Sequence, residues 1–187
     1  MNMNFINALH ALSMITEGAE DYQEKYKQYI IDHKKRVKQF ADWMKKNLPE
    51  IFNEAGLDDF DELIREHDES KFSEEEFEPY ARFWYNDSDH YDYDPEYEAA
   101  WEHHWKHNPH HPEYWLGDDM PFVYIIEMLC DWGSFGIAEG NILELVDYYY
   151  NEARDDDEKN LSESTKKIIE EILSKIEAIV KGGETNG

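Results

Sequence analysis

The sequence predicts an all-α protein, a single-domain helical bundle. Apolar residues recur at three- and four-residue steps along most of the 187 residues, and this spacing is typical of amphipathic helices. No stretch is convincing as a strand, and a chain of this length fits one domain. We expect a helical extension over residues 1–20, the helical domain over 21–181 and a disordered tail over 182–187.

The first firm helix runs from about Tyr22 to Asn47 and ends before Pro49. Its apolar residues share one face, and His33 stands in that apolar stripe. We therefore expect His33 to point into the core. A shorter amphipathic helix is expected upstream, over Phe5 to Ile15.

The middle of the chain predicts three more helices. One covers Asp58 to Arg65, and the next is capped by Ser73 and runs to about Tyr85. Serine followed by three glutamates suits a helix start, because its side chain can accept a backbone N–H and the acids complement the helix dipole. Asn86 to Asp94 is expected to be an acidic loop. Pro95 then suits the first turn of a helix to about His107.

The last third predicts three helices. Pro121 precedes an apolar helix over Phe122 to Phe135, and another covers Asn141 to Ala153. The final helix is capped by Ser162 or Ser164 and carries an isoleucine stripe.

The composition limits the classes of partner. The 18 basic and 44 acidic residues give a net charge of −26, which makes a nucleic acid an unfavourable partner. One cysteine, Cys130, allows no intramolecular disulfide. The chain has no apolar run of membrane-spanning length and no basic leader at its N-terminus. A cytoplasmic, soluble protein with no membrane contact is expected, and the sequence does not give its oligomeric state.

An adjacent His67-Asp68 pair is the central chemical feature of the sequence, and Lys71 follows three residues later. A neutral imidazole and a carboxylate are both good ligands for a divalent metal. The pair alone is a weak signal, but His33 and an inward-facing Asp131 strengthen it.

Asp131 lies in the apolar helix between Cys130 and Trp132, with Glu127 one turn before it on the same face. A buried carboxylate is costly unless it is paired or bound to metal. We expect Asp131 to be a metal ligand and Glu127 to support a ligand. The alternatives are a buried ion pair with a basic residue, or a helix face turned to solvent. Cys130 is expected to be an inert core residue.

Five of the nine histidines lie between Trp101 and Glu113. The tryptophans around His104 favour its burial, which leaves His103 and His107 on the exterior. His110 or His111 would then reach the metal from the following loop. The alternative is a solvated histidine-rich surface.

The order of these residues resembles the HD-domain superfamily of metal-dependent phosphohydrolases, all-helical proteins in which a lone histidine, an adjacent His-Asp pair and a distal aspartate bind a divalent metal. The wider motifs, including Asn-Pro-His-His-Pro-Glu-Tyr-Trp and Glu-Met-Leu-Cys-Asp-Trp, also resemble an uncharacterised HD-like family of bacteria and their phages. The resemblance covers about Tyr22 to Trp132.

This resemblance implies a site with one or two divalent ions of Mn, Fe, Zn, Ni or Mg. The first ion would be held by His33, His67, Asp68 and Asp131. Asp68 would bridge to a second ion held by His104 and by His111 or His110. The implied catalytic residues are Asp68, Lys71 and His104, and the implied substrate is a small phosphoester such as a nucleotide.

Two departures from the resemblance matter. Glu69-Ser70 replaces the usual small pair before Lys71, and no glycine-rich signature follows His111. A specific cyclic-dinucleotide phosphodiesterase class is therefore not assigned.

Two other functions remain open at this point. Some proteins that resemble this fold use similar ligands for two irons and oxidise substrates with oxygen, and ligand types alone do not separate the two chemistries. The protein could also be a non-enzymatic, acidic binding protein in which metal braces the fold. A basic rim containing Lys34, Lys35, Arg36 and Lys71 would favour a phosphorylated substrate.

Overall fold

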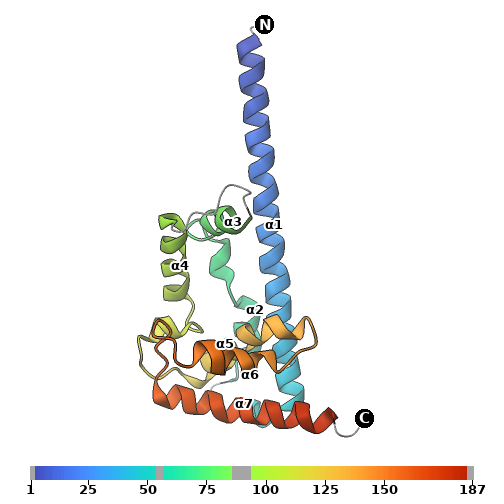
Figure 1. The fold of residues 1–187 in the computed structure, drawn as a ribbon, viewed down its shortest axis with the longest axis vertical. Coiled ribbons are helices and arrows are strands. Elements are labelled where there is room, and N and C mark those ends of the chain that lie inside the picture. The colour runs from blue at the N-terminus through green and yellow to red at the C-terminus, as the bar shows by residue number, and fades with distance from the viewer. Residues whose placement is uncertain (1–2, 54–56, 86–93, 185–187) are drawn as a thin grey trace. The chain divides into compact units, whose positions relative to one another are not determined.

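The computed structural model describes the backbone of residues 3–53, 57–85 and 94–184, and the side chains of 21–53, 57–85 and 94–182. Every regular element in these ranges is a helix, which confirms the all-α class (Figure 1). The contacts between residues divide the chain into two compact units. The first comprises residues 1–32 and 69–104, and the second comprises residues 33–68 and 105–187.

The longest element is α1, Met3–Asn47, which supplies residues to both units. The sequence predicts two helices here, but the backbone is helical without interruption from Met3. Gly18, between the two predicted helices, costs only about 1 kcal/mol in a helix interior. That cost is too small to break a helix on its own.

The first unit contains an aromatic cluster. Tyr26 and Ile30 from α1 pack with Tyr80 and Ala81 from α3, Phe77–Tyr85, and with Ala100 from α4, Pro95–His107. The predicted bounds of α4 are confirmed. The short 3₁₀ helix η2, Glu69–Phe72, also belongs to this unit.

The predicted helix start at Ser73 is wrong. The α3 helix begins at Phe77, and Ser73 Oγ makes no hydrogen bond within the described part of the chain. Glu76, placed by the prediction in the first helical turn, is instead fully buried against His103 and His104. The predicted loop Asn86 to Asp94 lies outside the described residues except at Asp94.

The second unit holds the larger apolar core. It is built around α5, Phe122–Ile137, with α2, Phe60–Glu66, α6, Glu144–Tyr148, and α7, Glu163–Glu184. Figure 1 shows α5 and α6 side by side, in agreement with the contacts between them. Short 3₁₀ helices at Ile51–Asn53 (η1) and Pro112–Trp115 (η3) complete this unit, together with the π-helix η4 at Tyr149–Ala153.

The ends of these helices differ modestly from the prediction. The segment predicted as one helix from Asn141 begins as α6 at Glu144 and ends as η4 at Ala153. Ser162 Oγ accepts the backbone N–H of Thr165 at 3.1 Å, so Ser162 is the cap of α7. The α7 helix continues to Glu184, and the rest of the expected tail lies outside the described residues.

Candidate metal centre

His33 lies on the buried face of α1, as its spacing predicts. Its neighbours at helical spacing, Ile30 and Val37, are fully buried, and His33 itself is only 2 % exposed. An imidazole on this face is surrounded by core residues, so its ring nitrogens can be satisfied only by other buried polar groups.

The His67-Asp68 pair lies where α2 ends. His67 has an extended backbone with ψ 129°, and Asp68 has φ 59° in the left-handed region. That conformation costs a non-glycine residue about 1–2 kcal/mol, although aspartate tolerates it better than most. The turn places His67 Nε2 and Asp68 Oδ2 3.5 Å apart, with both side chains about 1 % exposed or less. A strained backbone at a cluster of buried polar groups is typical of a functional site.

Asp131 and Glu127 project from the same face of α5, one turn apart. Asp131 Oδ1 lies 3.0 Å from His33 Nε2 and 3.6 Å from His67 Nε2. Its partners are therefore imidazoles, and the alternative of an ion pair with lysine or arginine is not what the described residues show. The side chain is 15 % exposed, in contrast to the almost complete burial of the two histidines.

The atoms of this group are spaced as metal ligands are. His33 Nε2 lies 3.3 Å from Asp68 Oδ2 and 3.4 Å from His67 Nε2. Two ligand atoms that each lie about 2.1 Å from one ion are about 3.0 Å apart at adjacent octahedral positions and about 3.4 Å apart at tetrahedral positions. His33, His67 and Asp68 therefore form a group that could hold a divalent ion, and Asp131 contacts both imidazole nitrogens.

Glu127 orients the imidazole of His67. Glu127 Oε1 lies 2.9 Å from His67 Nδ1 and 3.3 Å from His110 Nδ1, and the carboxylate is almost completely buried. When the imidazole of His67 is neutral and Nδ1 donates its proton to this carboxylate, the lone pair is on Nε2, the atom that faces His33 and Asp68. On the other side, Ser134 Oγ lies 3.4 Å from His33 Nδ1 and can fix that ring in the same sense.

The carboxylates and imidazoles stabilise one another's charges. Burial disfavours a charged His67, but the negative charge of Asp68 and hydrogen bonds to Asp131 and Glu127 raise the pKa of His67 to about 10. Burial also disfavours a charged Asp131, yet His33 and His67 hold its pKa well below the ordinary value. His110 and His67 likewise lower the pKa of Glu127 against the effect of its burial.

Asp68 offers its second oxygen to a neighbouring group. Asp68 Oδ1 lies 3.6 Å from His110 Nε2, and Asp68, His110 and His111 each offer a ligand atom within 4.8 Å of the others. A carboxylate with one oxygen towards each group has the form of a ligand that bridges two ions. His110 is buried, whereas His111 is 15 % exposed and has Nδ1 3.8 Å from Glu113 Oε2.

His104 belongs to the first unit, where it is buried as predicted while His107 is exposed. His104 Nδ1 lies 2.8 Å from Glu76 Oε2, and His103 Nδ1 lies 2.7 Å from Glu76 Oε1. Burial opposes ionisation of Glu76, but bonds to His104, His103 and Ser70 lower its pKa. Two roles stay predictions: that of His104 as a metal ligand, and that of Lys71 as a catalytic cation. Lys71 is half-buried in η2.

Glu76, Ser134 and the left-handed backbone of Asp68 were not expected from the sequence. Glu76 is the last of three consecutive glutamates, and nothing in that run singles it out. Ser134 follows Asp131 by three residues, a helical spacing that could have placed it near the same face. Cys130 is buried with a raised pKa, which agrees with the expectation of an inert thiol.

In the part of the chain that the structure describes, no helix has both the length and the apolar character needed to cross a membrane. A family model described as a family of unknown function (DUF5662) matches residues 22–175, most of the chain. Comparison with curated proteins and with solved structures gives no match. The matched range contains every residue of the candidate centre.

Proposed function

The chain belongs to this family of unknown function (DUF5662), and we propose that it is a metal-dependent phosphohydrolase acting on a small phosphoester such as a nucleotide. The observation that carries the proposal is the convergence of His33 Nε2, His67 Nε2 and Asp68 Oδ2 at 3.3–3.5 Å from one another. These separations suit ligands of one divalent ion of Mn, Fe, Zn, Ni or Mg.

The chain's own residues would hold and orient the reacting groups. A bound divalent ion would supply Lewis acidity and lower the pKa of a water molecule. His33, His67, Asp68 and Asp131 would hold the ion, and Glu127 would keep His67 Nε2 directed at it. Asp68 Oδ1, together with His110 and His111, would serve a second ion. Asp131 is the most exposed of the first four, so substrate would enter on its side.

The choice of phosphoester hydrolysis rests on the order of residues along the chain. His33, then His67-Asp68, then Asp131 resembles the ligand order of HD-domain phosphohydrolases. The same resemblance implies Lys71 as a point cation that offsets negative charge on the phosphoryl group, and His104 as a ligand of a second ion. The oxidation of a substrate by two irons uses the same ligand types, so metal identity separates the two chemistries.

A second candidate function follows from the net charge of −26. Such a charge repels an anionic substrate and favours binding to a basic protein, with metal serving only to stabilise the fold. In that case the ion would stay bound without any hydrolytic activity.

The test begins with the metal content of untagged protein, measured by mass spectrometry for the wild type and Asp131→Ala. Asp147→Ala, an exposed aspartate in α6, is the matched control. We expect a stoichiometric transition metal or Mg in the wild type and in Asp147→Ala, and its loss in Asp131→Ala. We also expect the wild type and Asp147→Ala to hydrolyse p-nitrophenyl phosphate, its diester or a member of a nucleotide panel, and Asp131→Ala to lose that activity.

The possible outcomes discriminate the functions. Metal without hydrolysis of any phosphoester, combined with unfolding in chelator, would indicate the metal-braced binding protein. Two irons per chain and oxygen consumption would indicate the oxidase. A wild type that is metal-free, folded in chelator and inactive after addition of each metal would refute the metal centre itself.

A further inference from the structure

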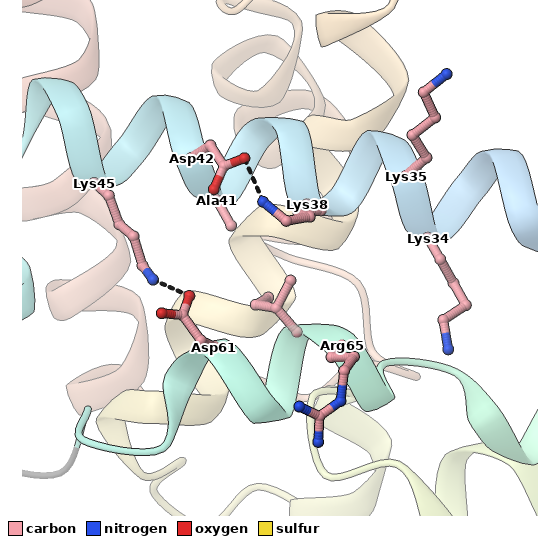
Figure 2. Close-up of a pocket in the computed structure, with 9 residues that line it drawn as sticks. Lys34, Lys35, Lys38, Ala41, Asp42, Lys45, Asp61 and Arg65 are labelled. Carbon is pink, nitrogen blue, oxygen red and sulfur yellow. Dashed lines mark hydrogen bonds and ion pairs between the residues drawn. The ribbon is translucent and has the colours of Figure 1, made fainter.

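A cavity of about 770 Å³ lies in the second unit between α1 and α2 (Figure 2). Its volume is in the range typical of small-molecule sites. The α1 helix lines it with a stripe of residues at helical spacing, and α2 lines it with the others. The lining residues are Lys34, Lys35, Lys38, Ala41, Asp42, Lys45, Asp61, Ile64 and Arg65.

The charge of this cavity is opposite to that of the chain. It contains five cationic and two acidic side chains, in a protein with 18 basic and 44 acidic residues. More than a quarter of all lysines and arginines therefore line one cavity. Like charges repel one another, so this clustering of cationic side chains indicates a ligand of negative charge.

The ion pairs made by the lining cations are exposed and weak enough to be exchanged. Lys38 Nζ lies 2.6 Å from Asp42 Oδ2, with side chains 66 % and 58 % exposed. Arg65 is 67 % exposed and pairs with two carboxylates outside the lining, Glu62 at 2.8 Å and Glu66 at 3.4 Å. Exposed pairs of this kind contribute little stability, whereas phosphate oxygens accept bonds from lysine and, in bidentate fashion, from arginine.

The base of the cavity is apolar and fixed. Ala41 and Ile64 are 2 % and 5 % exposed and belong to the core. Lys45 lies over the ring of Phe60, with Nζ 5.3 Å from the centroid, and forms an ion pair with Asp61. Figure 2 shows Lys34 and Arg65 at one end of the cavity and the Lys45–Asp61 pair at the other. An anion would therefore meet cations around an apolar floor.

We propose that this cavity binds a polyphosphate anion, either free or as the phosphate tail of a nucleotide. Lys34, Lys38 and Arg65 would contact the phosphates, and the floor of Ala41 and Ile64 would contact any attached apolar group. The site uses none of the candidate metal ligands. It shares Lys34 and Lys35 with the basic rim expected for a phosphorylated substrate, but its binding can be measured without metal and hence apart from the proposed hydrolysis.

The test is equilibrium binding to the full chain by calorimetry, with inorganic triphosphate, ATP and adenosine as probes in excess EDTA. Chelation removes any contribution from metal, and Asp131→Ala should bind the probes as the wild type does. We expect triphosphate, ATP or both to bind with a dissociation constant of about 1 mM or tighter at low salt, and adenosine to bind more weakly.

The decisive variant is the double substitution Lys38→Gln, Arg65→Gln. Its matched control is Lys175→Gln, Lys181→Gln on α7, which removes the same charge from exposed lysines, Lys181 being in an i,i+4 pair with Glu177 at 2.6 Å. We expect the cavity variant to bind the phosphorylated probe about tenfold more weakly, because it loses charge-assisted hydrogen bonds. The control should bind the probe within about twofold of the wild-type affinity, since it keeps every cation that lines the cavity. Circular dichroism verifies folding of both.

Binding of both phosphorylated probes would assign recognition to the phosphates, and binding of ATP alone would assign it to a nucleotide. The proposal is overturned if neither probe binds, or if the cavity variant and the α7 control bind equally well. Triphosphate binding by a wild type that is metal-free as purified and inactive after addition of each metal would support the cavity while refuting the metal centre.

Discussion

Glu127→Gln tests whether a buried carboxylate holds the metal ligand His67 in place. Glu127 Oε1 lies 2.9 Å from His67 Nδ1 and 3.3 Å from His110 Nδ1, and the side chain is 3 % exposed. The substitution keeps the size of the side chain and one acceptor oxygen, but it removes the charge that strengthens both bonds.

The magnitude follows from these two contacts. A hydrogen bond to a charged group contributes about 1.5–3 kcal/mol, roughly twice the value for a neutral one. Loss of the charge should therefore weaken the two contacts by about 1–3 kcal/mol in total. That corresponds to a metal affinity lower by about 10- to 100-fold, the range typical of residues that orient a ligand histidine.

The assay is competition for metal with a chromophoric chelator, using wild type, Glu127→Gln and Glu139→Gln. Glu139 is exposed just beyond α5 and serves as the control. Thermal unfolding in chelator separates a loss of folding from a loss of metal affinity. Equal metal affinities of the wild type and a folded Glu127→Gln would refute the orienting role of Glu127.

Three further predictions concern the fold. Asp68→Gly should be more stable than Asp68→Ala by about 1 kcal/mol in chelator, because both lose the carboxylate but only alanine is strained at φ 59°; equal denaturation midpoints would contradict that strain. Gly133→Ala should lower the free energy of unfolding by about 1–3 kcal/mol, since its Cβ would overlap the buried ring of Phe40, and urea denaturation would test this. Burial and a hydrogen bond to Glu78 raise the pKa of Tyr22 to about 12, so the folded protein should lose stability as the pH rises from about 10 to 12, where the unfolded phenol ionises first. Tyr22→Phe should lose about 1 kcal/mol at neutral pH and flatten that dependence, and unchanged pH profiles in the two proteins would refute the assignment.

The sequence by itself determined the helical class and several local features. The apolar spacing around His33 predicts its burial, and the i,i+4 relation of Glu127 and Asp131 places both on one face of α5. Ser162 caps α7 by accepting the backbone N–H of Thr165, one of the two serine caps that the sequence predicts. The bounds of α4 also agree with the prediction. These features depend on contacts within a few residues, which periodicity and capping preferences describe directly.

Only the tertiary structure decided which of these groups meet. It pairs Glu127 with His67 and buries His110 more deeply than His111. It also gives Asp68 a left-handed backbone, with Oδ2 towards His33 and Oδ1 towards His110. It also gathers cations from α1 and α2 into one cavity, although they are far apart in the sequence. Such pairings are set by how helix faces pack, and a single sequence does not encode packing partners in its local pattern. The physical reason is that a buried charge is tolerated only where another element supplies its partner.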